Sequence, residues 1–353
     1  MNKKIKITSF NNKNIITSNN FSRSANVVFA EFINNKEYNA IAKTKKTCKV
    51  VSNNEATLYF SKVFELKEND VIFCHTLFVE SLFTLLENIT EFKNLKLITS
   101  QSDIEIGKEL YRKKPNCIST WYAVNAAFES PNLIPIPLGL PETRNSKNII
   151  FSDFSEQDPI LKNKIHKVLV NFNLNTRYFH RYSFVKKALS NPFFTVSKAN
   201  LNYKKYIREL KNHKFVLVPW GNGIDTHRLW EALYAGAIPI TVKHNTFRTL
   251  KGLPIQFISS IREIDISNFE KNYLDYKNYE KLNIEWWISL IQSKKVSKKG
   301  TLKIDLNIHE VTKIKEMYDN NIRKINFKKK FYTFARKIHK KSLGIKVNKL
   351  VGM

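Results

Sequence analysis

Short apolar runs alternate with helical patterns from residue 70 to residue 137. The runs expected to form buried strands are 71–74, 95–99, 116–119 and 133–137. The helical patterns between them are 77–86 and 104–112. Strands that alternate with helices predict a parallel sheet with crossover helices. The chain before residue 70 has a weaker pattern, in which only 27–30 is expected to be a strand.

A second series of the same kind follows a hinge rich in proline and glycine, at 135–141. Its expected strands are 168–172, 193–196, 215–218, 238–242 and 254–258. Its expected helices are 178–189, 203–212, one that begins near 227, a short one at 245–250 and a late one at 269–291. We therefore expect an α/β protein with two Rossmann-like domains, 1–140 and 141–293, and a basic tail, 294–353.

Polar residues follow the expected strands of the first domain. They are His75, Ser100, Asp103, Trp121 and Asn125. Ligands of open parallel sheets bind beyond the carboxyl ends of the strands. These side chains are therefore expected near a cleft that faces the second domain.

The stretch 214–242 combines a strand, a glycine loop, a helix and a second strand. Gly221 and Gly223 allow the backbone of the loop to approach a ligand closely. Asp225 or Thr226 is expected to cap the helix, because a short side-chain oxygen can satisfy its first free amides. Gly236 is expected to end the helix.

This helix has two different faces at about 100° per residue. Its apolar side carries Leu229, Trp230 and Leu233, and its polar side carries His227, Arg228 and Glu231. Two cationic side chains at a helix N-terminus suit a phosphate, and Glu231 suits a hydroxylated group. In the alternative, Glu231 pairs with Arg228 or His227 on a solvated helix.

A second polar turn follows the expected strand 168–172. It carries Asn173, Asn175, Thr176 and Arg177 before a helix. This turn either faces a phosphate through Arg177 or is an Asx-type cap with a solvated arginine.

The run from Gly221 to Leu233, followed by Gly236-Ala237-Ile238-Pro239-Ile240, closely resembles the donor-site motif of exostosin-like glycosyltransferases. A looser likeness extends over much of 70–260. The resemblance implies a GT-B fold, in which two Rossmann-like domains face a cleft and the C-terminal domain holds a nucleotide sugar. In such folds a late helix often crosses back onto the first domain, and 269–291 is the candidate. Fucosyltransferase-like enzymes have a comparable layout, but their Tyr-x-Thr-Glu-Lys segment is absent here.

The resemblance also implies roles for the polar residues. Asn222 and Gly223 would allow a close approach of the donor, His227 and Arg228 would face its diphosphate, and Glu231 would accept hydrogen bonds from the ribose. Asp225 and Thr226, which lie within the same motif, are also expected at the donor. A UDP- or GDP-linked sugar is expected. No metal is expected, since protein cations and helix amides can replace it and no Asp-x-Asp motif stands out.

The family is generally inverting, and an inverting transferase needs a base for the acceptor hydroxyl. Asp103 and His75 are the candidate bases, because both follow expected strands of the first domain. The expected acceptor is a glycan or a lipid-linked glycan.

The charge and cysteine content narrow the alternatives. The 353 residues carry a formal net charge of +29, which reflects either a Lys- and Asn-rich composition or an acidic partner. Three isolated cysteines argue against a disulfide framework or a zinc site. The basic N-terminus has no apolar signal region, and no window is long and apolar enough to span a membrane, so a cytoplasmic protein is expected.

The tail from 323 to 346 combines basic clusters with a spaced apolar set. Phe327, Phe331, Phe334 and Ile338 follow a helical i, i+4, i+7, i+11 spacing. Such a helix either contacts an anionic membrane surface, which would make the protein peripheral, or packs on the protein with its lysines in water.

Two other functions stay open at this point. One is a non-catalytic glycan-binding relative of the fold. The other is a basic nucleic-acid-binding protein, although no recognisable nucleic-acid module is present, so no specific nucleic acid is expected.

Overall fold

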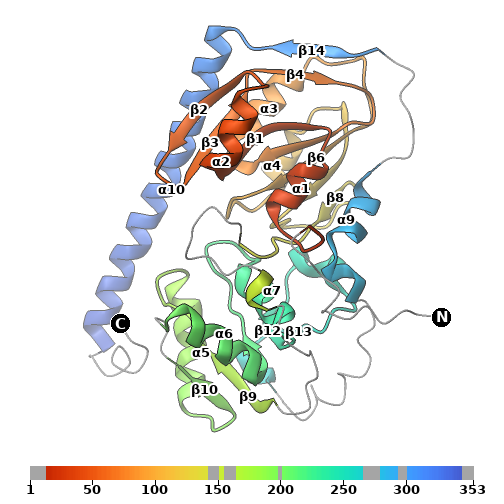
Figure 1. The fold of residues 1–353 in the computed structure, drawn as a ribbon. Helices are drawn as coiled ribbons and strands as arrows, with labels where there is room; N and C mark the ends of the chain where they lie inside the picture. The colour runs from red at the N-terminus through yellow and green to blue at the C-terminus, as the bar shows by residue number, and fades with distance from the viewer. Residues whose placement is uncertain are drawn as a thin grey trace, which may run out of the picture.

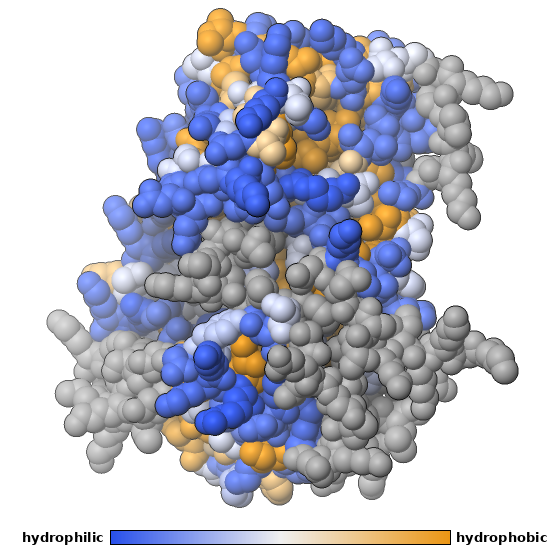
Figure 2. Space-filling model, viewed as in Figure 1, coloured by the Kyte–Doolittle hydropathy of each residue, from blue (hydrophilic) through white to orange (hydrophobic). Residues whose placement is uncertain are grey.

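The computed structural model describes residues 13–141, 151–154, 164–197, 201–264, 279–292 and 300–343. Residues 1–12 of the expected N-terminus, residues 269–278 of the expected late helix, and residues 294–299 and 344–353 of the expected basic tail lie outside this set. Figure 1 shows two α/β halves, one above the other, with a long helix running beside both. Figure 2 shows hydrophilic residues over much of the described surface in the same view.

The N-terminal half is built on a seven-stranded sheet of order β2-β3-β1-β5-β6-β7-β8. Its strands are β1 (Val27–Asn34), β2 (Thr47–Ser52), β3 (Ala56–Ser61), β5 (Val71–His75), β6 (Leu95–Ser100), β7 (Ile118–Ala123) and β8 (Leu133–Pro135). Its helices are α1 (Ser18–Ser24), α2 (Asn35–Ala42), the 3-10 turn η2 (Thr76–Phe78), α3 (Val79–Leu86) and α4 (Lys108–Arg112). The strands β1, β5, β6, β7 and β8 run parallel, whereas β3 and β2 pair in the antiparallel sense.

The parallel part of this sheet confirms the expectation, and one residue is placed differently. The strand expected at 116–119 instead continues to Ala123 as β7. Trp121 therefore lies within the strand, where it is fully buried and its Nε1 donates to Oγ1 of Thr99 at 2.8 Å. The prediction that Trp121 lies at the carboxyl edge was wrong, because its large ring fills the core on one face of the sheet.

The C-terminal half is built on five parallel strands of order β10-β9-β11-β12-β13. They are β9 (Ile165–Val170), β10 (Phe194–Val196), β11 (His213–Leu217), β12 (Ile238–Val242) and β13 (Gln256–Ile258). The helices are α5 (Tyr178–Leu189), α6 (Tyr203–Asn212) and α7 (His227–Tyr234), with 3-10 turns η5 (Asn245–Leu250) and η6 (Ile261–Glu263). The chain crosses from β10 over β9 to β11, so the strand order reverses between β9 and β11.

The late part of the chain returns to the N-terminal half. The turn η8 (Tyr279–Leu282) leads into α9 (Ile284–Ile291), and the Tyr122 hydroxyl donates to the carbonyl of Leu290 at 3.3 Å. A β-bridge also joins Ile15 to Asn283. These contacts confirm that the late segment crosses back, although its α-helix begins at Ile284 and the residues just before it form a 3-10 turn instead of the expected helix.

A buried hydrophobic cluster passes from one sheet to the other. It contains Phe73 and Ile98 of the first sheet, Val216 of the second, Leu229 of α7 and Trp287 of α9. The two halves therefore share apolar packing in addition to the polar contacts between their loops.

The residues expected to form a separate basic tail do not all lie apart from the two halves, because the first of them pack on the N-terminal half. The strand β14 (Leu302–Asp305) pairs with β4 (Val63–Leu66) of the N-terminal half. The 36-residue helix α10 (Ile308–Leu343) begins by packing Val311, Ile314 and Tyr318 into the N-terminal core. Its later turns are largely exposed. Among the residues that the structure describes, no helix is long and apolar enough to cross a membrane.

Candidate functional site

The strongest candidate site lies at the strand-order reversal of the C-terminal sheet. Open α/β sheets bind ligands at such a switch point, because the loops on either side diverge there. The loop after β9 and the loop after β11 are joined by two arginines. Nε of Arg177 donates to the carbonyl of Gly221, and Nε of Arg181 donates to the carbonyl of Trp220, both at 2.9 Å.

The carboxyl edges of the two sheets meet at this place. Asn125, which follows β7, accepts hydrogen bonds through Oδ1 from the amides of Ile224 and Asp225 at 3.0 and 2.9 Å. Glu105, after β6, forms an ion pair with Arg177 at 2.7 Å. The loop after β11 is therefore held from both halves.

Gly223 is required by the close approach of the N-terminal half. A Cβ at this position would lie 2.8 Å from Nδ2 of Asn125 and 3.3 Å from Oδ1 of Asp103. The sequence predicted a close approach at this glycine, and the structure shows that Asn125 and Asp103 make it. Asp103 is exposed and lies beside the glycine loop. Asn222 is also exposed, and its carbonyl faces Nη2 of Arg177 at 3.5 Å.

Asp225 has a structural role that the sequence did not reveal. Its buried carboxylate accepts from Nε1 of Trp230 at 3.0 Å and from the amide of Leu138 in the connection between the halves at 2.8 Å. Burial raises the pKa of Asp225 to about 7, and these hydrogen bonds oppose the shift. Thr226 occupies the N-cap position, but its side chain makes no capping bond. The expected side-chain cap of α7 is therefore absent.

Asp225→Asn is expected to flatten the pH dependence of the free energy of unfolding between about pH 4 and pH 7. A carboxyl whose pKa rises on folding from 3.8 to about 7 binds more protons in the folded state. Its contribution is fully present below the lower pKa and is lost as the pH rises through the higher one. Denaturant unfolding of both proteins at several pH values measures the difference.

The measurement compares the two proteins because His180 is present in both and changes the free energy of unfolding with pH in the opposite sense to Asp225. Burial, with help from Arg177 and Arg181, lowers the pKa of His180 to about 4, so its contribution is lost as the pH falls. A difference between wild type and Asp225→Asn that stays constant across this pH range would contradict the prediction.

The polar face of α7 is covered rather than solvated. Nδ1 of His227 lies 2.8 Å from the carbonyl of Gly139 in the hinge. Arg228 lies over the ring of Tyr206, 5.2 Å from its centroid, and Oε2 of Glu231 accepts from the Tyr206 hydroxyl at 2.6 Å. Arg228 and Glu231 form no ion pair although both are described, so the alternative of a solvated salt pair between them is not seen.

Gly139 fits this arrangement because its φ of +78° lies in the left-handed region. A Cβ at this position would lie 2.1 Å from the carbonyl oxygen of Ile16. Any larger residue would displace the hinge that contacts His227.

Three guanidinium groups gather at the switch point, and we call Arg177, Arg181 and Arg228 the arginine cluster. Burial, followed by the charges of Arg228 and Arg177, lowers the pKa of Arg181 to about 10. Among the described residues, the ion pair with Glu105 is the one that the cluster forms. The cluster therefore carries a positive potential that an anion would relieve.

Several buried polar atoms around the cluster have no hydrogen-bond partner among the described residues. They are Nη1 of Arg228, Oγ1 of Thr226, Oγ1 of Thr176 and Nε2 of His180. Unpaired buried polar atoms are costly, and in a native protein they call for a ligand, an ion or a water. Arg228 and Thr226 lie at the first turn of α7, where the helix dipole also favours a negative charge.

Sequence reasoning missed Arg181, Tyr206, Asn125 as a loop anchor, and the His180–Trp220 pair, whose rings stack at 5.3 Å. Arg181 was detectable, since it lies in the first turn of the expected helix 178–189, four residues after Arg177. The sequence left open whether Arg177 faces a phosphate or is solvated beside an Asx-type cap. Its side chain bonds to the glycine loop and to Glu105, so it is not a solvated arginine.

The two candidate bases are in different surroundings. His75 is 4% exposed, and its Nδ1 accepts from the amide of Leu77 at 3.3 Å at the start of η2. This is the environment of a capping residue. Asp103 is exposed beside Gly223, so we retain Asp103 as the candidate base.

Within the described ranges, no group of three or more His, Cys, Asp or Glu side chains is arranged to hold a metal ion. Neither the models of known protein families nor the curated proteins with which the chain was compared give a match. The assignment of function therefore depends on the site itself.

Proposed function

We propose that the protein is a glycosyltransferase that uses a nucleotide sugar and has a GT-B arrangement. The observation that carries the proposal is the arginine cluster with its unpartnered donors at the switch point, facing residues of the other half. A compact dianion at this point would accept bonds from Arg228 and Thr226 and would lie at the N-terminus of α7.

The diphosphate of the donor is assigned to this position. Charge develops on the leaving diphosphate as the glycosidic bond breaks, and fixed cations stabilise it more in the transition state than in the ground state. Arg228 is the principal contact in this proposal, with Arg181 and Arg177 supporting the local potential. His227 supports the hinge through Gly139 and contributes to the same positive end of the helix.

Glu231 is assigned to the ribose. The Tyr206 hydroxyl donates a hydrogen bond to Oε2 and orients the carboxylate, while Oε1 has no partner among the described residues. A carboxylate oxygen can accept hydrogen bonds from vicinal hydroxyls. The Tyr206 contact is thus a positioning contact for Glu231 within the proposed donor site.

The acceptor is assigned to the N-terminal side. Asp103 lies across the glycine loop and is the group we propose as the base that takes the proton of the acceptor hydroxyl. In an inverting reaction that hydroxyl attacks the anomeric carbon from the side opposite the departing nucleoside diphosphate. A glycan or lipid-linked glycan acceptor belongs to the same proposal.

A thermal-shift screen against UDP, GDP, CMP and their common sugar conjugates tests the proposal. One nucleoside diphosphate and its sugar are expected to raise the melting temperature, because a ligand that binds only the folded state stabilises it. CMP is expected to have little effect, since it lacks the second phosphate. No shift with any diphosphate at millimolar concentration would contradict the donor site.

Transfer and binding separate the enzyme from a non-catalytic relative. Release of nucleoside diphosphate from the matching sugar donor, dependent on an acceptor, supports the enzyme. Binding of the donor without any release supports a binding protein instead. Asp103→Asn is expected to keep donor binding and lose transfer, which tests the proposed base separately from the arginine cluster.

A further inference from the structure

The later turns of α10 carry a row of exposed aromatic and aliphatic side chains. Phe327, Phe331, Phe334 and Ile338 form this row, which we call the outer face. Their exposed fractions run from 75% for Phe327 to 55% for Ile338. Large apolar side chains gathered in one exposed row mark an interaction surface more often than a solvated one.

The outer face points away from the protein. Tyr318 and Arg336 lie on the same side of α10, because the interval between them, at about 100° per residue, completes whole turns. Tyr318 packs into the N-terminal core, and Nη1 of Arg336 donates to Oδ1 of Asn175 at 2.9 Å. The four residues of the outer face lie roughly 140° to 180° around the helix from that side. α10 is thus held at two places on the side opposite the outer face, so its apolar row faces outward.

Basic residues flank the outer face. Arg323, Lys324, Lys330 and Lys337 lie within roughly 90° of its centre. All four are exposed. From Asn320 to Met353 the sequence has no Asp or Glu, whereas Lys and Arg recur throughout. Arg323, Lys330 and Lys337 lie on one side of the apolar row, and Lys324 lies on the other. An apolar row bordered by cations is the arrangement of a helix that lies in the plane of an anionic membrane surface.

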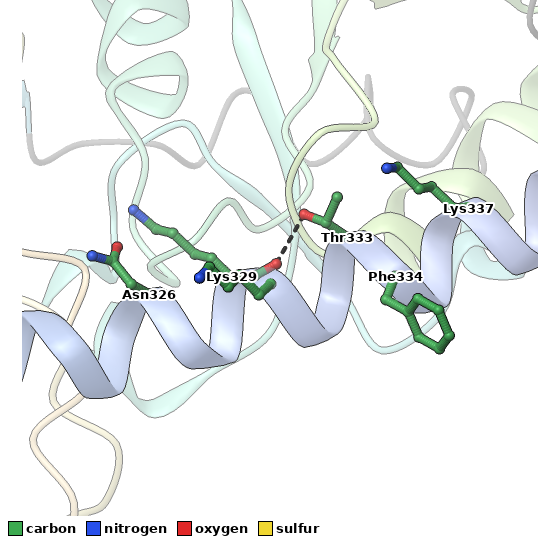
Figure 3. A pocket seen from close by; sticks show the side chains of 6 residues that line it. Asn326, Lys329, Thr333, Phe334 and Lys337 are labelled. Carbon is green, nitrogen blue, oxygen red and sulfur yellow. Dashed lines mark hydrogen bonds between the residues drawn. The ribbon is translucent and has the colours of Figure 1, made fainter.

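One flank of α10 also lines a hollow of about 500 Å³. Its lining residues all belong to α10 and are Asn326, Lys329, Lys330, Thr333, Phe334 and Lys337. Figure 3 shows Asn326, Thr333 and Lys337 on one side of the helix and the ring of Phe334 on the other. Within the described residues Lys330 and Lys337 form no ion pair, so they are available to an anionic headgroup. Lys329 lies close to the Tyr318 side of the helix and is not part of this contact.

We propose that the outer face of α10 docks on an anionic lipid bilayer. The phenyl rings enter the interface, and the flanking cations contact lipid phosphates. A second copy of the chain is a poorer occupant, because it would place the same cations against one another. The row from Phe327 to Ile338 is about 16 Å long, so it can lie flat on the surface. The inference does not depend on sugar transfer.

Sedimentation of the full chain with vesicles tests the proposal. Binding is expected to vesicles that mix phosphatidylglycerol with phosphatidylcholine, and little binding is expected to pure phosphatidylcholine. Raising the salt concentration is expected to weaken binding, because exposed charges are screened beyond about 8 Å at physiological ionic strength. Equal binding to both vesicle types would overturn the anionic requirement.

Substitutions locate the contact. Phe331→Ser is expected to lower the partition coefficient about tenfold, and the triple substitution of Phe327, Phe331 and Phe334 by serine at least about 100-fold. Phe193→Ser is the matched control, since Phe193 is a phenylalanine of similar exposure, 58%, that precedes β10 and does not belong to α10. Lys330→Glu with Lys337→Glu is expected to weaken binding without removing an aromatic ring.

Three results would overturn the proposal. The triple variant, folded by circular dichroism, could sediment with anionic vesicles as wild type does. The wild type could instead form a dimer in solution that dissociates in the triple variant. That result would identify a second copy of the chain as the occupant of the outer face. A single-stranded oligonucleotide could bind in place of vesicles and lose affinity in the triple variant, which would identify nucleic acid.

Discussion

Replacing Arg228 with alanine is expected to weaken nucleotide-sugar binding by on the order of 100-fold, at the scale of two charge-assisted hydrogen bonds. The guanidinium lies over Tyr206, and its buried Nη1 has no partner in the described part of the free protein. Its removal therefore deletes a contact to the ligand without breaking a hydrogen bond of the fold. Isothermal titration with the nucleotide found in the screen measures the loss.

Two further substitutions, Arg208→Ala and Arg228→Lys, serve as controls for this experiment. Arg208 is exposed on α6, so Arg208→Ala removes a positive charge from the neighbouring helix without touching the cluster. It is expected to change the affinity less than about threefold, since exposed charges act weakly. Arg228→Lys is expected to be intermediate, because an ammonium keeps the charge but not the paired geometry. Unchanged affinity in Arg228→Ala, with the fold intact, would remove the diphosphate from this position.

Leu233→Ala is expected to destabilise the protein by about 2–5 kcal/mol, the cost of a cavity in a packed core. Leu233 is 2% exposed and belongs to the hydrophobic cluster that joins the two sheets. The loss therefore affects both halves and not α7 alone. Urea unfolding, followed by circular dichroism and by tryptophan fluorescence, measures the free energy and tests whether the halves unfold together.

Leu189→Ala provides the comparison for this variant. Leu189 lies at the end of α5 and is 39% exposed, so the same change in side chain and helix propensity removes much less buried surface. Its effect is expected to stay below about 1 kcal/mol. Similar losses in the two variants would show that burial of the apolar face of α7 does not explain the stability.

The strands of the C-terminal sheet were predicted closely, and the reason is local. A parallel strand that is buried on both faces is a continuous apolar run, and β11 and β12 are of this kind. The chain before β5 was poorly predicted, since β3 is fully buried while its partner β2 is largely exposed. Their antiparallel pairing joins segments with no common pattern, so it depends on contacts between strands.

The candidate site was likewise predicted where it depends on neighbouring residues and missed where it depends on contacts between distant elements. The polar face of α7 was predictable, because His227, Arg228 and Glu231 share one side of a short helix. Asp225 was expected at the ligand, yet it holds Trp230 and Leu138 instead, since the connection between the halves passes over it. Arg181 joins Arg228 only because α5 and α7 begin on opposite sides of the switch point.

The sequence by itself determined the alternation of strands and helices, the glycine loop and the amphipathic character of α7 and of the tail, because each depends on residues within one or two turns of each other. The tertiary structure decided which polar groups meet. Asn125 and Asp103 reach the glycine loop from the other sheet, and Tyr206 covers Glu231 from α6. It also decided that the phenyl rings of α10 face outward, because the opposite side of that helix packs on Phe78 through Tyr318. Such contacts join residues distant in the chain, so no local pattern records them.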